Sequence, residues 1–252
     1  MTPAAVGFQC PECVQGGQAT VREARTPFGG RMVAQAKVTW TLIGINLAVF
    51  LVQLGLGINA MAGDWGMWPV GVAVGGEWWR LITSAFLHGS ILHIAFNMYV
   101  LFVLGPTLER IFGHVRYLAL YVLAALGGSV ASYWFSDLRT VSVGASGAIF
   151  GLMGALIVAG RRLRYDVTQV LILLAINVVI GFVAPGIDWR AHLGGLVVGA
   201  IVAAILAYAP QRNRTLWQAL GCLTVLAVLV IAVMVRTVQI QQLVAPLGVV
   251  LS

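Results

Sequence analysis

Two short motifs carry side chains that can transfer an acyl group. Ser146 lies between glycines in the segment Gly144-Ala145-Ser146-Gly147, and His192 follows Ala191 at the start of a later apolar stretch. A serine hydroxyl can attack a carbonyl carbon while an imidazole accepts the hydroxyl proton and later returns it. No acidic third member is evident, because Asp188 has the setting of a loop residue. The pattern therefore predicts a Ser-His dyad.

A second polar pair, His93 and Asn97, is spaced four residues apart and so shares one face of a helix. Such side chains, together with the backbone amide of Ser146, can stabilise an oxyanion that forms on an attacked carbonyl. Ser146 also begins an apolar stretch, and the amides and dipole at a helix start favour negative charge. We therefore expect His93, Asn97 and the Ser146 amide at the oxyanion.

The composition places these residues in a membrane. Only 9% of the 252 residues are charged and the mean hydropathy is +0.94, whereas a soluble domain carries about 25% charged residues. Polar groups are costly at membrane depth, so those that occur there mark function or helix packing. The net charge of +7 comes from arginines in short loops, where they set orientation, and does not indicate nucleic-acid binding.

The apolar stretches predict an all-α polytopic membrane protein, since a crossing takes roughly 20 residues. Seven transmembrane helices are expected, at 38–57, 91–107, 116–135, 146–160, 167–184, 191–209 and 216–235. Three regions follow from this division: a cytosolic tail at 1–37, a six-helix core at 38–209, and an added C-terminal helix with a short external tail at 210–252. The tryptophan-rich connection at 58–90 suits an amphipathic element in the membrane interface.

Basic residues orient the chain. With the N-terminus in the cytoplasm, eleven of the fifteen Lys and Arg residues fall inside, and only Arg80, Arg139, Arg190 and Arg236 fall outside. The second, fourth and sixth helices then run inward, so their polar residues share the outer half of the membrane. We expect an active site toward the outer leaflet of what the arginine-rich, lysine-poor composition suggests is a bacterial plasma membrane.

Small residues predict how two of these helices meet. Gly147 and Gly151 form a strip on the fourth, and His192, Gly195 and Gly199 share a face of the sixth. Small residues let helix backbones approach closely. Contact along these strips would bring the serine hydroxyl to the imidazole.

Taken together, the motifs resemble the rhomboid family of intramembrane serine proteases over roughly residues 75–209. The matching pieces, in order, are Trp79-Arg80, His88, His93-Ile94-Ala95-Phe96-Asn97, Gly144-Ala145-Ser146-Gly147 and Ala191-His192-Leu193-Gly194-Gly195-x-x-x-Gly199. The resemblance implies a six-helix core with an added C-terminal helix. It implies hydrolysis of peptide bonds in or near transmembrane segments of other membrane proteins, with Ser146 as nucleophile and His192 as base.

The resemblance also assigns supporting parts. The loop with Glu77, Trp79 and Arg80 would insert laterally into the outer leaflet, and the fifth helix with the loop near 185–190 would gate the substrate. We expect structural roles for Trp79, Arg80 and His88, and leave open whether Glu77 or Asp188 assists. Phe150 stands where some relatives carry a tyrosine; it can stack on the imidazole, so activity should survive.

The sequence contains few signals for cofactors or partners. Cys10 and Cys13 have the spacing of zinc ligands, but a complete site needs four ligands and no second pair follows in the tail. A remnant of a zinc site, a site shared in a dimer, or no site at all remain open. No cofactor is expected for the dyad, and the expected partners are transmembrane protein substrates and the lipid bilayer. Oligomeric state is not predicted.

Three other functions compete. An inactive rhomboid-like protein that binds membrane clients would keep the fold, but both catalytic motifs are intact here. A metalloenzyme could use His88, His93 and His192, yet no acidic residue stands beside them as base. A transporter or channel would need polar residues through the inner leaflet, where the fourth and sixth helices are apolar. Taken singly, Ser146 and His192 would also suit ordinary helix packing.

Overall fold

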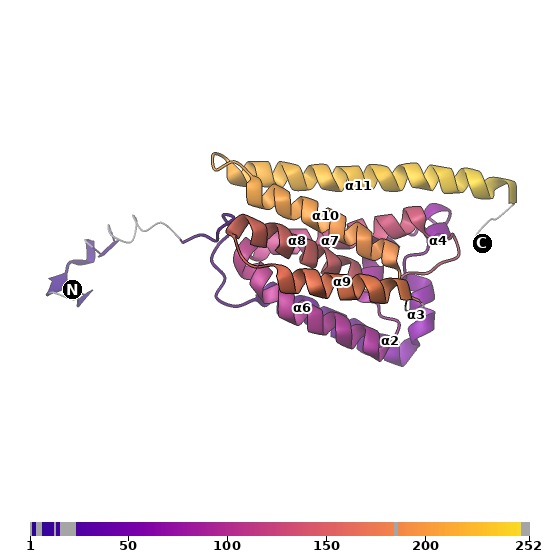
Figure 1. Cartoon of the computed structure of the whole chain (residues 1–252), viewed down its shortest axis with the longest axis horizontal. Helices are drawn as coiled ribbons and strands as arrows, with labels where there is room; N and C mark the ends of the chain where they lie inside the picture. The colour runs from indigo at the N-terminus through magenta and orange to yellow at the C-terminus, as the bar shows by residue number, and fades with distance from the viewer. Residues whose placement is uncertain (1, 4–6, 13, 16–23, 184–185, 248–252) are drawn as a thin grey trace.

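Helices dominate the structure, a computed structural model that describes residues 2–3, 7–12, 14–15, 24–183 and 186–247 (Figure 1). Six described helices are long and apolar enough to cross a membrane: α2 (Lys37–Leu56), α6 (Ile91–Phe112), α7 (His114–Phe135), α8 (Ser146–Leu163), α10 (Trp189–Tyr208) and α11 (Arg214–Val244). The apolar helix α9 (Thr168–Val183) is shorter, with 16 residues. The predicted all-α polytopic membrane fold is confirmed.

Several predicted helix ends were wrong. Helix α6 continues through Pro106 to Phe112, beyond the predicted end at 107. Only Gly113 separates α6 from α7, because its φ of +83° lets the chain reverse in one residue. Arg110, expected in a loop, therefore lies in the last turn of α6, and Arg116, expected at the start of the next helix, lies in the first turn of α7. Helix α11 runs to Val244, well into the stretch predicted as an external tail.

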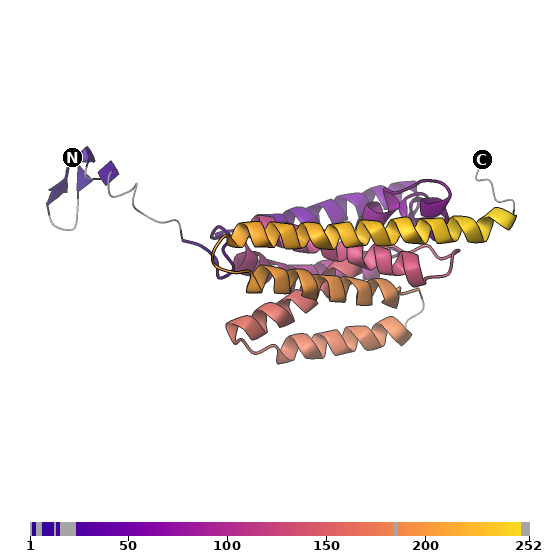
Figure 2. The same ribbon diagram turned by 90° about the horizontal axis from the view of Figure 1, so that it is seen from above.

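The long helices lie side by side along the long axis of the molecule, with α11 along one side (Figures 1 and 2). Helix α10 makes its most extensive contacts with α8 and α7. Helix α8 is the most enclosed of the long helices, with 61% of its apolar window buried, against 11% in α11. The helix that begins with Ser146 therefore lies at the centre of the bundle.

Glycines set the close approach of α8 and α10. A Cβ added at Gly195 would overlap the carbonyl oxygen of Gly147, and one at Gly199 would overlap the backbone of Gly151. Backbone thus packs directly on backbone along the two strips of small residues. Since both strips begin near the helix starts, the first turns of α8 and α10 are held beside each other.

The connection between α2 and α6 folds into short helices rather than one amphipathic element. These are α3 (Ile58–Trp65), α4 (Pro69–Ala73), α5 (Arg80–Thr83) and the 3-10 turn η1 (Ser84–Phe86). Trp65, Trp78 and Trp79 are each close to half exposed. Exposed tryptophans on a membrane protein suit the interface between lipid and water.

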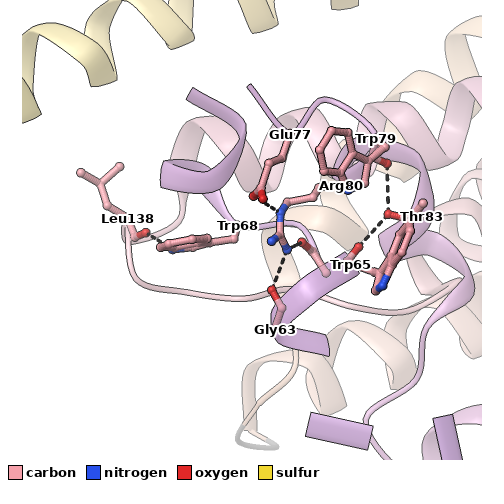
Figure 3. A network of polar contacts seen from close by, with 9 residues as sticks. Gly63, Trp65, Trp68, Glu77, Trp79, Arg80, Thr83 and Leu138 are labelled. Carbon is pink, nitrogen blue, oxygen red and sulfur yellow. Dashed lines mark hydrogen bonds and ion pairs between the residues drawn. The ribbon is translucent and has the colours of Figure 1, made fainter. Parts of the chain in front are cut away.

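Arg80 lies at the centre of this connection (Figure 3). Its Nη1 donates to the carbonyl oxygens of Gly63 at 2.7 Å and Gly66 at 2.9 Å, and its Nε pairs with Glu77 at 2.5 Å. The side chain is only 5% exposed, so these partners compensate a buried charge. Trp79 enters the network only through its carbonyl, which accepts from the Thr83 hydroxyl at 3.1 Å.

The N-terminal tail contributes a short antiparallel pair, β1 (Thr2–Pro3) with β2 (Phe8–Gln9). Cys13 lies outside the described residues, so the structure does not describe the Cys10 and Cys13 pair. Among the described side chains, no group of three or more His, Cys, Asp or Glu is arranged to hold a metal. The described chain ends with the 3-10 turn η2 (Ala245–Leu247).

Candidate active site

Ser146 and His192 lie within hydrogen-bond distance of each other. The hydroxyl of Ser146, in the first turn of α8, is 2.8 Å from Nε2 of His192, in the first turn of α10. Both residues are partly buried. The structure thus brings together the two side chains that the sequence pattern paired.

The segment before Ser146 is held by backbone contacts. Met67 and Ser142 exchange two hydrogen bonds of 2.9 Å, and the amide of Gly144 donates to the carbonyl of Ser84 at 2.9 Å. Gly144 has a φ of +137°, a backbone conformation that residues other than glycine rarely adopt. The connection built around Arg80 therefore also fixes the entry into α8.

His192 is positioned from two sides. Phe150, one turn after Ser146, stacks on the imidazole with ring centroids 4.1 Å apart and planes at 17°. On α9, a Cβ at Gly181 would lie 3.4 Å from His192 Nδ1. That Nδ1 is buried, and no side chain in the described part of the chain hydrogen-bonds to it. A third member at hydrogen-bond distance is therefore not found among these residues.

Asp188 lies in the loop just before α10, as the sequence suggested, but it also has a structural role that the sequence analysis did not assign. It is the N-cap of α10, and its side chain accepts from the amides of Arg190 at 3.1 Å and Ala191 at 3.3 Å. The Ser132 hydroxyl of α7 donates to the other carboxylate oxygen. The carboxylate thus ties the start of α10, and with it His192, to α7.

The two oxyanion candidates lie on α6. The amide of His93 donates to the N-cap Ser90 at 3.1 Å, which holds the first turn. A Cβ at Gly144 would lie 2.9 Å from Cε1 and Nε2 of His93 and 3.4 Å from the Ser146 oxygen. The His93 ring and the Ser146 hydroxyl therefore face the same small space. Asn97 is 4% exposed, and its Nδ2 has no partner among the described residues.

His88 is fully buried behind His93. Its ring contacts that of His93 with centroids 5.1 Å apart and that of Phe50 at 6.3 Å. Burial, followed by the nearby His93, lowers the pKa of His88 to about 3, so the ring is neutral at physiological pH. Gln53 of α2 both donates to the His88 carbonyl, at 3.2 Å, and accepts from its amide, at 2.9 Å.

Gln53 and Glu109 were missed by the sequence analysis. Both are polar, lie in apolar stretches and have no exposed surface, which is itself a signal of a structural or functional role. Glu109 accepts from the amides of Val38 and Thr39 at the start of α2, and its carboxylate lies 2.5 Å from His114. His114 is the first residue of α7.

A small cavity adjoins the dyad. It has a volume of about 60 Å³ and lies between α8, α9 and α10, with Phe150, Val178, Gly181 and His192 in its lining. Helix α9 thus borders the imidazole. Position 185 of the predicted gate loop lies outside the described part of the chain.

Comparison with known proteins identifies a family. A family model described as Rhomboid domain matches residues 75–209. Rhomboid protease GluP of Bacillus subtilis is 43% identical over 136 residues, which cover 52% of this chain and 26% of GluP. Rhomboid protease AarA of Providencia stuartii is 29% identical over 252 residues, covering 84% of this chain and 88% of AarA. RHOMBOID-like protein 6, mitochondrial, of Arabidopsis thaliana is 38% identical over 149 residues, 56% of this chain and 48% of that protein.

The family match and the apolar helices together show what kind of protein this is. It spans more than half of the chain and includes every residue of the candidate dyad and oxyanion site. Six described helices are long and apolar enough to cross a bilayer, so the protein is an integral membrane protein. Two of the similar proteins bear the name rhomboid protease. The chain belongs to the rhomboid family.

Proposed function

We propose that the protein is an intramembrane serine endopeptidase that cleaves peptide bonds in or near transmembrane segments of other membrane proteins. The observation that carries this proposal is the 2.8 Å contact between the Ser146 hydroxyl and His192 Nε2. Membership of a family with members named as proteases supports it further.

In the proposed reaction, Ser146 attacks the scissile carbonyl while His192 accepts the hydroxyl proton. The Ser–carbonyl bond forms, and the carbonyl oxygen becomes an oxyanion. Collapse of this intermediate breaks the peptide bond, and His192 returns the proton to the leaving amine. Water, activated by the same imidazole, then releases the acyl group from Ser146 and restores the enzyme.

Three donors are available for the oxyanion in this proposal: the Ser146 amide, the His93 ring and the Asn97 side chain. The free amide nitrogen of Asn97 supports its part, because a buried donor without a partner is costly unless a ligand satisfies it. Donors aimed at the developing charge are typically worth about 3 kcal/mol each.

The substrate is proposed to be a single-span membrane protein with small or helix-breaking residues near the outer end of its segment. A peptide bond within a helix must be unwound before Ser146 can reach it, and glycine and proline lower the cost of unwinding because they disfavour helix. The bias of basic residues supports an orientation with the N-terminus in the cytoplasm and the dyad toward the outer leaflet.

The first experiment compares wild type, Ser146→Ala and His192→Ala on a reporter protein with one transmembrane segment, in liposomes. We expect wild type alone to cleave, with and without a chelator, because each variant removes a reacting group. Thr224→Ala on α11, whose hydroxyl bonds only within its own helix, is the matched control and should cleave normally.

Other outcomes point to other functions. Cleavage that survives Ser146→Ala but stops with chelator would refute the dyad in favour of metal catalysis. If wild type binds the reporter segment but leaves it intact in every lipid and detergent tested, the client-binding role is favoured.

A further inference from the structure

Three arginines converge at the end of the bundle opposite the dyad. Arg25 comes from the segment before α2, Arg116 from the first turn of α7, and Arg214 from the first residue of α11. Gly29 lies between two of them: a Cβ there would be 3.6 Å from Nη1 of Arg214 and 3.9 Å from Nη2 of Arg116. Segments far apart in the sequence thus bring their guanidinium groups to one place.

Neutral groups hold these side chains in position. Arg214 Nη1 donates to the Pro27 carbonyl at 3.1 Å, and Arg25 Nη1 donates to the Gly29 carbonyl at 3.3 Å. Arg116 Nε donates to the Gln218 side chain at 2.7 Å. Because every acceptor is uncharged, the contacts orient the guanidinium groups without neutralising them.

The positive charge at this place is uncompensated within the described chain. The ion pairs described are Arg80 with Glu77 and Glu109 with His114, and neither involves these arginines. Arg25 and Arg214 both lie close enough to Arg116 to repel it. In addition, Nε of Arg214 is buried and has no hydrogen-bond partner among the described groups. A bound anion would relieve the repulsion and could accept from this free donor.

The surroundings indicate what kind of anion fits. A hollow of about 690 Å³ is lined by Arg25, Gly29 and Arg214 together with Thr26, Gln211, Asn213, Thr215 and Leu216. Arg116 reaches its edge through a 3.3 Å bond to the Thr215 hydroxyl. Next to the hollow, Leu216 and Trp217 are 54% and 52% exposed. Apolar side chains thus continue directly from the charged site along the exposed surface of α11.

We propose that Arg25, Arg116 and Arg214 bind the phosphate of an anionic phospholipid in the leaflet opposite the active site. Guanidinium groups match phosphate oxygens in both charge and geometry. The exposed Leu216 and Trp217 favour a lipid over free phosphate, because they would lie along its acyl chains. Basic pockets between transmembrane helices bind lipid headgroups in this way. The bound lipid would fasten the segment 25–31 and the sparsely packed α11 to α7.

The test uses the full-length protein in detergent, with dioleoylphosphatidylglycerol or dioleoylphosphatidylcholine added, and counts retained lipids by native mass spectrometry. We expect retention of the anionic lipid and roughly fivefold weaker binding for each arginine replaced, in Arg25→Gln and Arg116→Gln. Arg212→Gln is the matched control, since Arg212 is exposed in the turn just before α11 but does not line the hollow.

A second readout guards against a folding defect. Phosphatidylglycerol should raise the melting temperature of wild type and of Arg212→Gln. It should raise the melting temperature of Arg25→Gln much less. This variant should still fold, because it loses only one exposed hydrogen bond in a loop. Equal loss of lipid in Arg212→Gln would overturn the proposal in favour of general surface charge. Full competition by inorganic phosphate, with no preference for the anionic lipid, would overturn the assignment to a lipid.

Discussion

At the residue scale, the approach of the His93 ring to the Ser146 hydroxyl depends on the small space at Gly144. The missing side chain at this position leaves room for the His93 ring on one side and the Ser146 oxygen on the other. A carbonyl that entered this space would meet the nucleophile and a donor together. The reactive geometry therefore rests on a residue that takes no part in proton transfer.

We predict that Gly144→Ala reduces cleavage by about 10²-fold or more, since small misplacements of reacting groups have effects of this size. The new Cβ would press against His93, and the φ of +137° would be strained. Cleavage rate and melting temperature are measured together. The control is Gly44→Ala on α2, where a Cβ meets nothing within 4 Å. Normal cleavage by Gly144→Ala would exclude the proposed arrangement.

At the element scale, α8 and α10 carry the dyad because their backbones touch. We predict that Gly195→Ala lowers both the melting temperature and the cleavage rate, because its Cβ would overlap the Gly147 carbonyl and push the helices apart. Gly55→Ala on α2, which meets nothing within 4 Å, should change neither. A stable, fully active Gly195→Ala protein would contradict the close packing.

The start of α10 depends on its cap. We predict that Asp188→Ala lowers the free energy of unfolding by about 1 kcal/mol, the usual contribution of an N-cap. It should also reduce cleavage, because the start of α10, which carries His192, is no longer joined to Ser132 of α7 through the Asp188 carboxylate. Asp188→Asn keeps a capping oxygen and should retain most activity. Equal loss in both variants, at unchanged stability, would instead mean that the carboxylate charge itself acts on His192. Cleavage over a pH series separates these cases.

At the scale of the whole molecule, the two ends of the bundle differ in chemistry. The dyad lies where α8 and α10 begin, and the arginine cluster lies where α7 and α11 begin. An excess of basic residues at one end orients a membrane protein with that end in the cytoplasm. In our proposals the same arginines serve both the orientation of the chain in the membrane and lipid binding.

We predict that reporters fused to the two termini lie on opposite sides of the membrane, with the N-terminus in the cytoplasm. An odd number of crossings puts the two termini on opposite sides. The number is seven only if α9, which has 16 residues, also crosses the membrane. A reporter inserted after Arg212 should lie in the cytoplasm and serves as the internal control. Termini on the same side would mean that one of the seven helices does not cross.

The amino-acid sequence by itself determined the class of the protein, the order of its helices and the pairing of Ser146 with His192. These follow from local properties: apolar length, polar residues placed within apolar stretches, and glycines at helical spacing. Helix ends were less predictable, because Gly113 turns the chain in a single residue and α11 remains helical past its apolar stretch.

The tertiary structure alone decided the contacts that join distant segments. Gln53 with His88, Glu109 with the start of α2, Asp188 with Ser132, and the meeting of Arg25, Arg116 and Arg214 have no local pattern. Each links residues far apart in the chain, so it depends on how whole helices pack rather than on neighbouring residues. The role of Asp188 was missed for this reason: its partner Ser132 on α7 becomes a neighbour only when α7 and α10 lie together.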